Sequence, residues 1–159
     1  MRPTTVELLE SIAQALEDQV LPVIQDKWGA STLRSAMQLL RHLALRVPLE
    51  PRILAADNED VRRVLTLACE RLAQLGETDL AATAAAVLSS PPVDPLDVVA
   101  ADALNETYLR AVDTIVAARD RLRPLDAPPT IHQSLVDYLQ RRLERERGMF
   151  LPVFLSPPF

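Results

Sequence analysis

Histidine, the side chain best suited to proton transfer at neutral pH, occurs twice in this chain, at His42 and His132. His42 shares a helical face with Arg41 and Arg46, so we expect it on the solvated surface. His132 falls in the first turn of an expected helix, where the positive helix end disfavours the protonated imidazole. A structural or surface role is the simpler interpretation of His132, and a general base is the alternative. Neither histidine has a glutamate three residues before it or a second histidine one turn away, so no metal site is predicted.

Other reactive residue types are sparse. Cys69 lies beside Leu65 and Leu72 on an apolar helical face, which indicates a small core residue rather than an activated thiolate. The three glycines are far apart, at expected helix ends, so no glycine-rich loop is available to cradle a phosphate. No serine lies in a nucleophile-elbow sequence. The sequence therefore predicts no catalytic residue and no cofactor, and it favours a non-enzymatic role.

Charged residues gather at two places. Asp57, Glu59 and Asp60 surround an expected helix start, where carboxylates are stabilised by the helix end without any catalytic purpose. Near the end of the last expected helix, arginines alternate with glutamates, which is typical of a solvated, salt-bridged face. The alternative for this second cluster is a patch that binds an anion, formed by Arg141, Arg142 and Arg145.

The last eleven residues, 149–159, contain all three phenylalanines of the chain. The prolines of this segment predict an extended conformation, and an apolar segment of this kind is rarely left exposed on a soluble monomer. We expect it to dock on its own helical bundle or on a partner, which would be a second copy or another protein, and a contact with a membrane or lipid is the remaining alternative. The candidate docking residues are Phe150, Leu151, Phe154, Leu155 and Phe159.

The elements that would position these residues are helices. Apolar residues recur at alternating spacings of three and four over 4–24 and again over 32–47, which predicts two amphipathic helices that pack as an antiparallel hairpin. Pro22 should kink the first helix or begin a second short one. Gly29 is expected to end that segment, and Pro48 with Pro51 is expected to end the second helix.

Four further helices are predicted over 58–75, 80–88, 95–123 and 130–147, with Asn58, Asp94 and Thr130 among their caps. The proline-rich stretch 89–95 is interpreted as a loop within one domain. The fold class is therefore all-α: a single-domain bundle of about six helices over 1–148, followed by an extended tail over 149–159. No strand pattern and no repeat is found.

Composition limits the possible functions. The 159 residues are 48% hydrophobic and 25% charged with a net charge of −5, which suits one packed domain and argues against a general nucleic-acid binder. A single cysteine excludes an intrachain disulfide, and the first residues lack the apolar core of a signal peptide, so a cytoplasmic location is expected. No apolar run reaches the roughly 20 residues that a membrane-spanning helix needs.

The first third of the chain carries one family resemblance. Residues 2–24, from Arg-Pro-Thr-Thr-Val-Glu-Leu-Leu-Glu to Leu-Glu-Asp-Gln-Val-Leu-Pro-Val-Ile, followed by an arginine-bearing helix, resemble the opening of an uncharacterised bacterial all-helical family. Its members are encoded near aminoglycoside-phosphotransferase-like kinases and acyl-CoA dehydrogenases. The resemblance implies an accessory role near acyl-CoA or phosphotransfer metabolism, with no catalytic residues to carry over.

Two functional hypotheses follow. The first is a non-catalytic accessory or protein-interaction role, with a homodimer as the expected assembly or a second protein as partner. The second is a bundle that binds a small molecule or an acyl chain. In a catalytic version of this hypothesis, the bundle is an enzyme that uses His132 together with nearby carboxylates.

Overall fold

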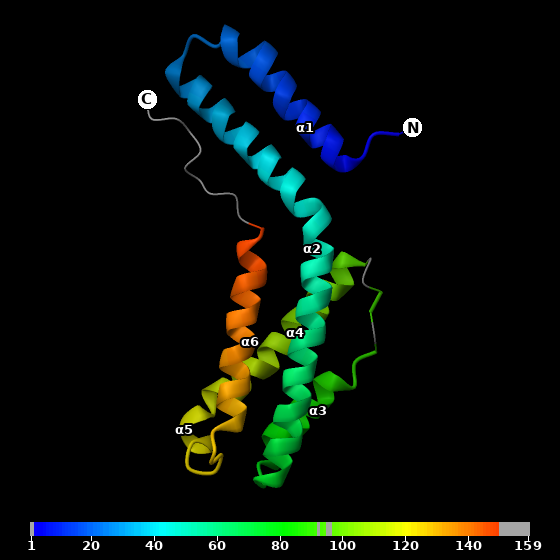
Figure 1. Ribbon diagram of the computed structural model, residues 1–159, viewed down its shortest axis with the longest axis vertical. Coiled ribbons are helices and arrows are strands. Elements are labelled where there is room, and N and C mark those ends of the chain that lie inside the picture. Colours follow the sequence, from blue (N-terminus) through cyan, green and yellow to red (C-terminus); the bar gives the residue numbers. More distant parts are fainter. Residues whose placement is uncertain (1, 92, 95–96, 150–159) are drawn as a thin grey trace. The chain divides into compact units, whose positions relative to one another are not determined.

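The computed structural model describes residues 2–91, 93–94 and 97–149, and over these residues the chain is all-α, without a strand. This confirms the predicted fold class. Figure 1 shows the helices, coloured in chain order. A π-helical turn at Leu16–Val20 and a 3-10 turn at Leu21–Val23 follow the first of them. The helices of the described residues are α1 Thr5–Ala15, α2 Lys27–Gln74, α3 Thr78–Leu88, α4 Val98–Ala117, α5 Arg119–Leu122 and α6 Thr130–Arg147. The docking residues expected in the tail, Phe150 to Phe159, lie outside the described part of the chain.

The described residues divide into two compact units. One comprises residues 2–50 and 147–149, and the other comprises residues 51–146 without the two short gaps. Each unit is described by itself below.

The first unit is a helical hairpin, as predicted. Thr4 caps α1 with a reciprocal pair of hydrogen bonds: its hydroxyl accepts from the Glu7 N–H at 3.2 Å, and the Glu7 carboxylate accepts from the Thr4 N–H at 2.7 Å. The backbone bond is the main cause that lowers the pKa of Glu7. Pro22 lies in the 3-10 turn, where its missing N–H costs little, so the predicted second short helix is present.

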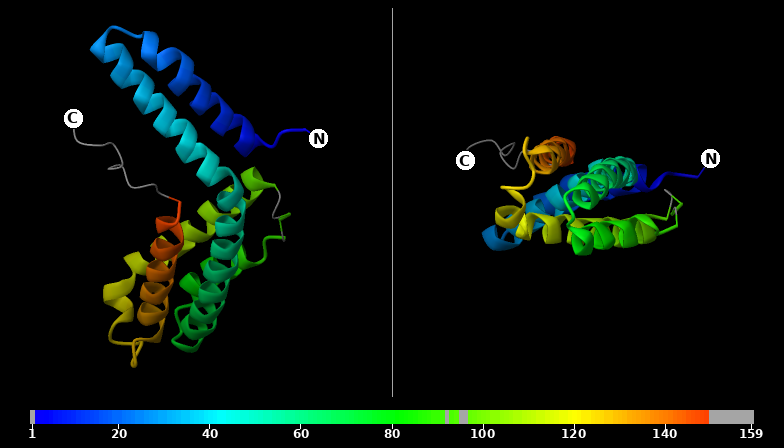
Figure 2. Two further views of the ribbon diagram at one scale, coloured as in Figure 1. Left: turned by 45° about the horizontal axis from the view of Figure 1, so that its top comes forward. Right: turned by 90° about the horizontal axis from the view of Figure 1, so that it is seen from below.

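Helix α1 and the first part of α2 lie side by side in both views (Figures 1 and 2), and an ion pair joins Glu17 to Arg41. Among the described residues of this unit, three apolar side chains are buried: Ala13, Met37 and Ala44.

Two predicted boundaries in α2 are wrong. Gly29 does not end a helix; it lies in the first turn of α2, where the Asp26 carboxylate accepts its N–H at 2.6 Å. Pro48 and Pro51 do not end a helix either, since α2 continues through both to Gln74. A proline inside a helix removes a backbone hydrogen bond and costs about 3 kcal/mol, but tertiary packing can override that cost. The boundary between the two units falls between Glu50 and Pro51.

The second unit contains the main core. It is built from the later part of α2 together with α3, α4, α5 and α6, and Gly76, with φ of 78°, ends α2 in the left-handed conformation that glycine tolerates. Cys69 packs against this core, and its thiol donates to the Ala81 carbonyl at 3.4 Å, in agreement with the predicted core role. The buried cluster consists of Val61, Val64, Leu65, Ala68, Leu72, Leu80, Ala81, Tyr108, Ala111, Val112, Ile115, Leu122, Ile131, Leu135 and Tyr138.

Three predictions in the second unit need correction. Asn58 starts no helix, because it lies within α2, and its amide donates to the Ala101 carbonyl at 2.8 Å. Asp97 caps α4 in place of the predicted Asp94: its carboxylate accepts the Ala100 N–H at 3.0 Å. The long helix predicted over 95–123 is divided into α4 and the short α5.

Candidate functional site

The arginines that the sequence proposed as an anion patch face a pair of buried aspartates. Asp57 and Asp60 lie nearly one turn apart in α2, and each is only 5% exposed. Arg141 binds Asp60 with two parallel bonds, Nη2 to Oδ1 at 2.9 Å and Nε to Oδ2 at 2.9 Å. Arg145 joins the two carboxylates, with 2.7 Å to Asp57 Oδ1 and 3.0 Å to Asp60 Oδ2. Bidentate geometry of this kind is the strongest arrangement for an arginine and a carboxylate.

Neutral donors complete the coordination of Asp57. Its Oδ2 accepts from the Asn105 amide at 2.9 Å and from the Tyr138 hydroxyl at 3.1 Å. The Nη1 atom of Arg142 lies 3.7 Å from the same oxygen, and its Nε donates a hydrogen bond to Glu146 Oε1 at 2.9 Å. Burial, and next the charge of Asp57, raises the pKa of Tyr138 to about 12. Hydrogen bonding from Arg141 is the largest cause of the lowered pKa of Asp60.

This polar cluster holds helices together rather than forming an open site. Arg141 and Arg145 donate these hydrogen bonds to carboxylates of the chain itself, those of Asp57 and Asp60. Sequence reasoning assigned Asp57 and Asp60 to a helix start and missed this role. One signal was available: Asp57, Val61 and Val64 follow the spacing of one helical face, which places an acid on the apolar stripe.

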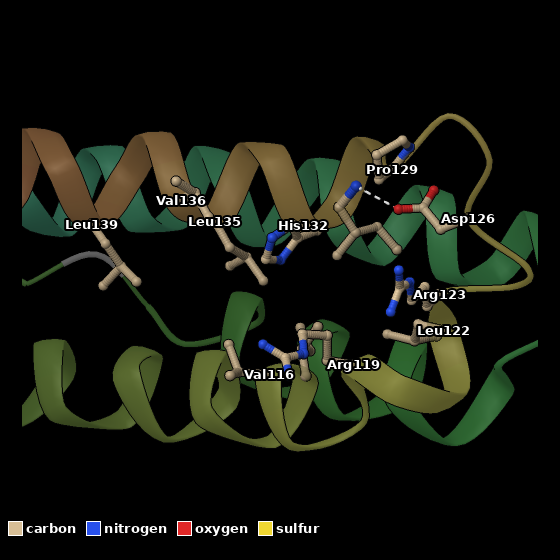
Figure 3. Close-up of a pocket in the computed structure, with 12 residues that line it drawn as sticks. Val116, Arg119, Leu122, Arg123, Asp126, Pro129, His132, Leu135, Val136 and Leu139 are labelled. Atoms are coloured by element: carbon tan, nitrogen blue, oxygen red, sulfur yellow. Dashed lines mark hydrogen bonds between the residues drawn. The ribbon is translucent and has the colours of Figure 1, made fainter.

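A pocket of about 510 Å³ lies elsewhere in the second unit, between the end of α4, the short α5 and the first half of α6 (Figure 3). Its volume falls within the range of roughly 300–1,000 Å³ that is usual for small-molecule sites. Its wall is largely apolar. The lining residues are Ile115, Val116, Arg119, Leu122, Arg123, Asp126, Pro129, Ile131, His132, Leu135, Val136 and Leu139.

Three basic side chains line this pocket, and His132, the histidine that the sequence singled out, is one of them. It lies in the first turn of α6, as predicted, and is exposed. Arg119 and Arg123 come from α5 and the residue that follows it. Within the described residues, neither Arg123 nor His132 has a side-chain hydrogen bond or an ion pair. Among the described residues, the ion-pair partner of Arg119 is Asp120, with 3.6 Å between Nε and Oδ1. The Asp120 side chain is 92% exposed, and a salt bridge at such an exposed position contributes little to stability.

The one acidic lining residue, Asp126, is already occupied. Its Oδ1 accepts from Arg71 Nε at 3.1 Å, and its Oδ2 accepts the Ile131 N–H at 2.8 Å, the bond drawn in Figure 3. Asp126 therefore caps the start of α6, a role that the sequence gave to Thr130, whose hydroxyl instead donates to the Pro128 carbonyl at 3.1 Å. With the charge of Asp126 matched by Arg71, the remaining charge at the pocket is positive.

The lining residues of the pocket offer His132 no free carboxylate that could orient it. A histidine that acts as a general base is oriented by a second group, and the only lining carboxylate is engaged by Arg71 and the backbone. Among the described residues, no group of three or more His, Cys, Asp or Glu side chains is arranged to hold a metal ion. Sequence reasoning did not single out Arg119 or Arg123, because both lie in the predicted helix 95–123 and nothing in their spacing marks a pocket.

Comparison with known proteins found no matching protein-family model, no matching curated protein and no matching solved structure. None of the helices within 2–91, 93–94 and 97–149 combines the length and apolar composition that a membrane crossing requires.

Proposed function

We propose that this chain is a non-catalytic accessory protein that binds a small amphipathic anion, an acyl chain or similar apolar body with an anionic head, in the pocket beside α6. One observation carries the proposal. The pocket wall is apolar, and the polar side chains on it that lack a well-placed partner are the guanidinium groups of Arg119 and Arg123 and the imidazole of His132, each of which can donate a hydrogen bond to an anion. A ligand that satisfies both features has an apolar body and a negative head.

The two parts of such a ligand would contribute different amounts. Each methylene buried against the wall formed by Ile115, Leu135 and Leu139 stabilises the complex by about 0.8 kcal/mol. A hydrogen bond from a charged donor to the head contributes about 1.5–3 kcal/mol. Because ordering the ligand offsets part of this gain, chain length and head charge should both be needed for measurable affinity.

An acyl ligand also agrees with the accessory role near acyl-CoA or phosphotransfer metabolism that the N-terminal resemblance implies. In that role the protein holds or presents an acyl compound to another protein, and its own residues perform no chemistry.

Matched eight-carbon probes test the proposal. Octanoate and octyl phosphate carry a negative head, octan-1-ol a neutral one and octyltrimethylammonium a positive one. Titration of the full chain by calorimetry, with amide chemical shifts followed by NMR, should show binding of the two anions, weaker binding of the alcohol and none of the cation. The shifts should cluster in residues 115–139. Equal binding of the alcohol and the anions would contradict the role of the basic groups.

Substitutions then test which side chains bind the anionic head group of octanoate. Arg123→Gln should weaken octanoate binding by about tenfold, the size expected for one lost charge-assisted bond. His132→Gln should weaken it by a smaller factor, since the amide replaces one N–H donor with another. Arg110→Gln is the matched control, since Arg110 lies on α4, is 72% exposed and does not line the pocket. If Arg123→Gln and His132→Gln bind as tightly as Arg110→Gln, the pocket is not the site.

A further inference from the structure

The short helix α5 and the residue after it carry arginines on two sides. The Arg123 N–H donates to the Arg119 carbonyl at 2.9 Å, so helical geometry continues to Arg123. Residues four apart lie on the same side of a helix, and both of these arginines line the pocket. Arg121, two residues from each, lies on the opposite side, where its Nη2 is 2.7 Å from Glu77 Oε2. Among the described residues, the arginine outside the pocket therefore has the closest carboxylate.

The two arginines at the pocket repel each other. Like charges four residues apart destabilise a helix. Asp120 offsets little of this repulsion, because its side chain is 92% exposed, and the lining carboxylate of Asp126 is already paired with Arg71. An anion bound between the guanidinium groups of Arg119 and Arg123 would remove the repulsion. The pair therefore favours a ligand whose negative charge matches two guanidinium groups.

His132 adds a donor from the other wall of the pocket. Figure 3 shows α6, which carries His132, on one side of the pocket, and α4 and α5 on the other. An imidazole can donate through one N–H, and a guanidinium group donates from a fixed fork. One such fork is enough to engage both oxygens of a carboxylate. A phosphate monoester has three terminal oxygens and a charge of about −1.5 to −2 at pH 7, so it can accept from both guanidinium groups and the imidazole.

We propose that the ligand of this pocket is a phosphate monoester with an alkyl body. Arg119, Arg123 and His132 bind the phosphate, and the apolar wall binds the alkyl chain. This assignment rests on the proposed function and narrows its anionic head to a phosphate. A free phosphate ion would leave the apolar wall unused, and a carboxylate would leave one guanidinium group without an acceptor. The charge of the phosphate approaches that needed to neutralise the two arginines.

Three eight-carbon probes separate the charge of the head from its shape. Octyl phosphate and octyl sulfate both have three terminal oxygens, but the sulfate carries a single charge, and octanoate has a single charge and two oxygens. The full chain is titrated by calorimetry at about pH 7.5, above the second phosphate pKa of about 6, with each probe below its micelle-forming concentration. Octyl phosphate should bind about tenfold more tightly than octyl sulfate or octanoate, as expected for one further charge beside partly exposed guanidinium groups.

Inorganic phosphate distinguishes a free phosphate ion from an alkyl phosphate. It should bind at least about 100-fold more weakly than octyl phosphate, because it buries no methylene group against the apolar wall. Binding of inorganic phosphate as tight as that of octyl phosphate would overturn the assignment, since the alkyl body would then contribute nothing.

Substitutions test whether the two arginines at the pocket read the charge of the head. In Arg119→Gln and in Arg123→Gln, the preference for octyl phosphate over octyl sulfate should fall from about tenfold to about threefold or less, because each variant lacks one guanidinium group. Arg121→Gln is the matched control, since it removes the same charge from the opposite side of α5, and it should keep the tenfold preference. An equal loss in Arg121→Gln and Arg123→Gln would overturn the assignment, because the preference would then come from the general field of α5.

The probes also separate this assignment from the proposed function. Equal binding of octyl phosphate, octyl sulfate and octanoate would overturn the phosphate assignment, and the proposed function would stand, because it requires only an anionic head. If none of the three anions binds, both are wrong.

Discussion

The two units of this chain differ in the way they treat apolar side chains. Of the buried apolar residues described, three belong to the hairpin and all others to residues 51–146. The larger unit has a continuous core, and the hairpin exposes large apolar side chains on both of its helices, among them Ile12 and Leu39. Burial of apolar surface is the main favourable term in folding. The core of the second unit therefore contributes more to stability than the few buried side chains of the hairpin.

Polar groups show the same contrast. In the second unit, carboxylates lie inside the protein and are matched by arginines, as at Asp57, Asp60 and Asp126. In the hairpin, the ion pair between Glu17 and Arg41 joins side chains that are each 41% exposed. Buried pairs are expensive to break, because removal of one partner leaves a charge uncompensated, whereas exposed pairs contribute little. Charge therefore contributes more to the packing of the second unit than to that of the hairpin.

The largest effect is expected where this contrast is sharpest, at Arg145. Arg145→Met keeps an apolar stem but removes the donors to Asp57 and Asp60, and it should lower the free energy of unfolding by about 3 kcal/mol. Urea denaturation followed by circular dichroism measures the loss. Arg110→Met, which removes a 72% exposed guanidinium, should change it by less than about 0.5 kcal/mol. Similar losses in the two variants would show that the buried cluster does not stabilise the unit.

A smaller effect, with a distinctive pH dependence, is expected at Tyr138. Tyr138→Phe removes the hydroxyl that donates to Asp57 and should cost about 1–2 kcal/mol at pH 7. Because the pKa of Tyr138 is raised to about 12 from a usual value of 10.0, the folded state retains a proton that the unfolded chain loses. This stabilisation is complete below pH 10 and is lost as the pH rises toward 12.

Unfolding measured at several alkaline pH values checks that prediction. The unchanged chain should lose stability between pH 10 and 12, and Tyr138→Phe should lose less over the same interval. Tyr108→Phe, in the same core, is the control: its hydroxyl accepts from Arg62 at 3.2 Å, and the alkaline loss should persist in this variant. Equal alkaline slopes in Tyr138→Phe and the unchanged chain would rule out Tyr138 as the titrating group.

Much of the fold follows from local patterns. The spacing of apolar residues predicted the all-α class and the hairpin, since both depend on periodicity that a helix converts directly into a buried face. The same reasoning failed at Pro48 and Pro51, which were expected to end a helix that continues to Gln74. A local rule gives the cost of a proline, but the contacts that offset this cost come from distant residues.

The candidate site could be predicted only in part. His132 was singled out because its residue type is chemically informative. Arg119 and Arg123 became relevant only when α4, α5 and α6 were seen to enclose one pocket with them. The role of Asp57 was missed for the same reason, because its partners Tyr138 and Arg145 lie more than eighty residues away in the sequence. Predictions for the tail over 149–159 and for the homodimer stay predictions.

The smallest effect tests whether the two units are energetically separate. Thr4→Ala removes the hydroxyl that caps α1 and should cost about 1 kcal/mol. Thr5→Ala, one residue after the capping residue, is the control. If the hairpin opens independently of the larger core, hydrogen exchange should become faster in residues 5–15 and stay unchanged in residues 61–72. Faster exchange in both segments would mean that the units open as one, and the difference in their cores would then have no energetic consequence.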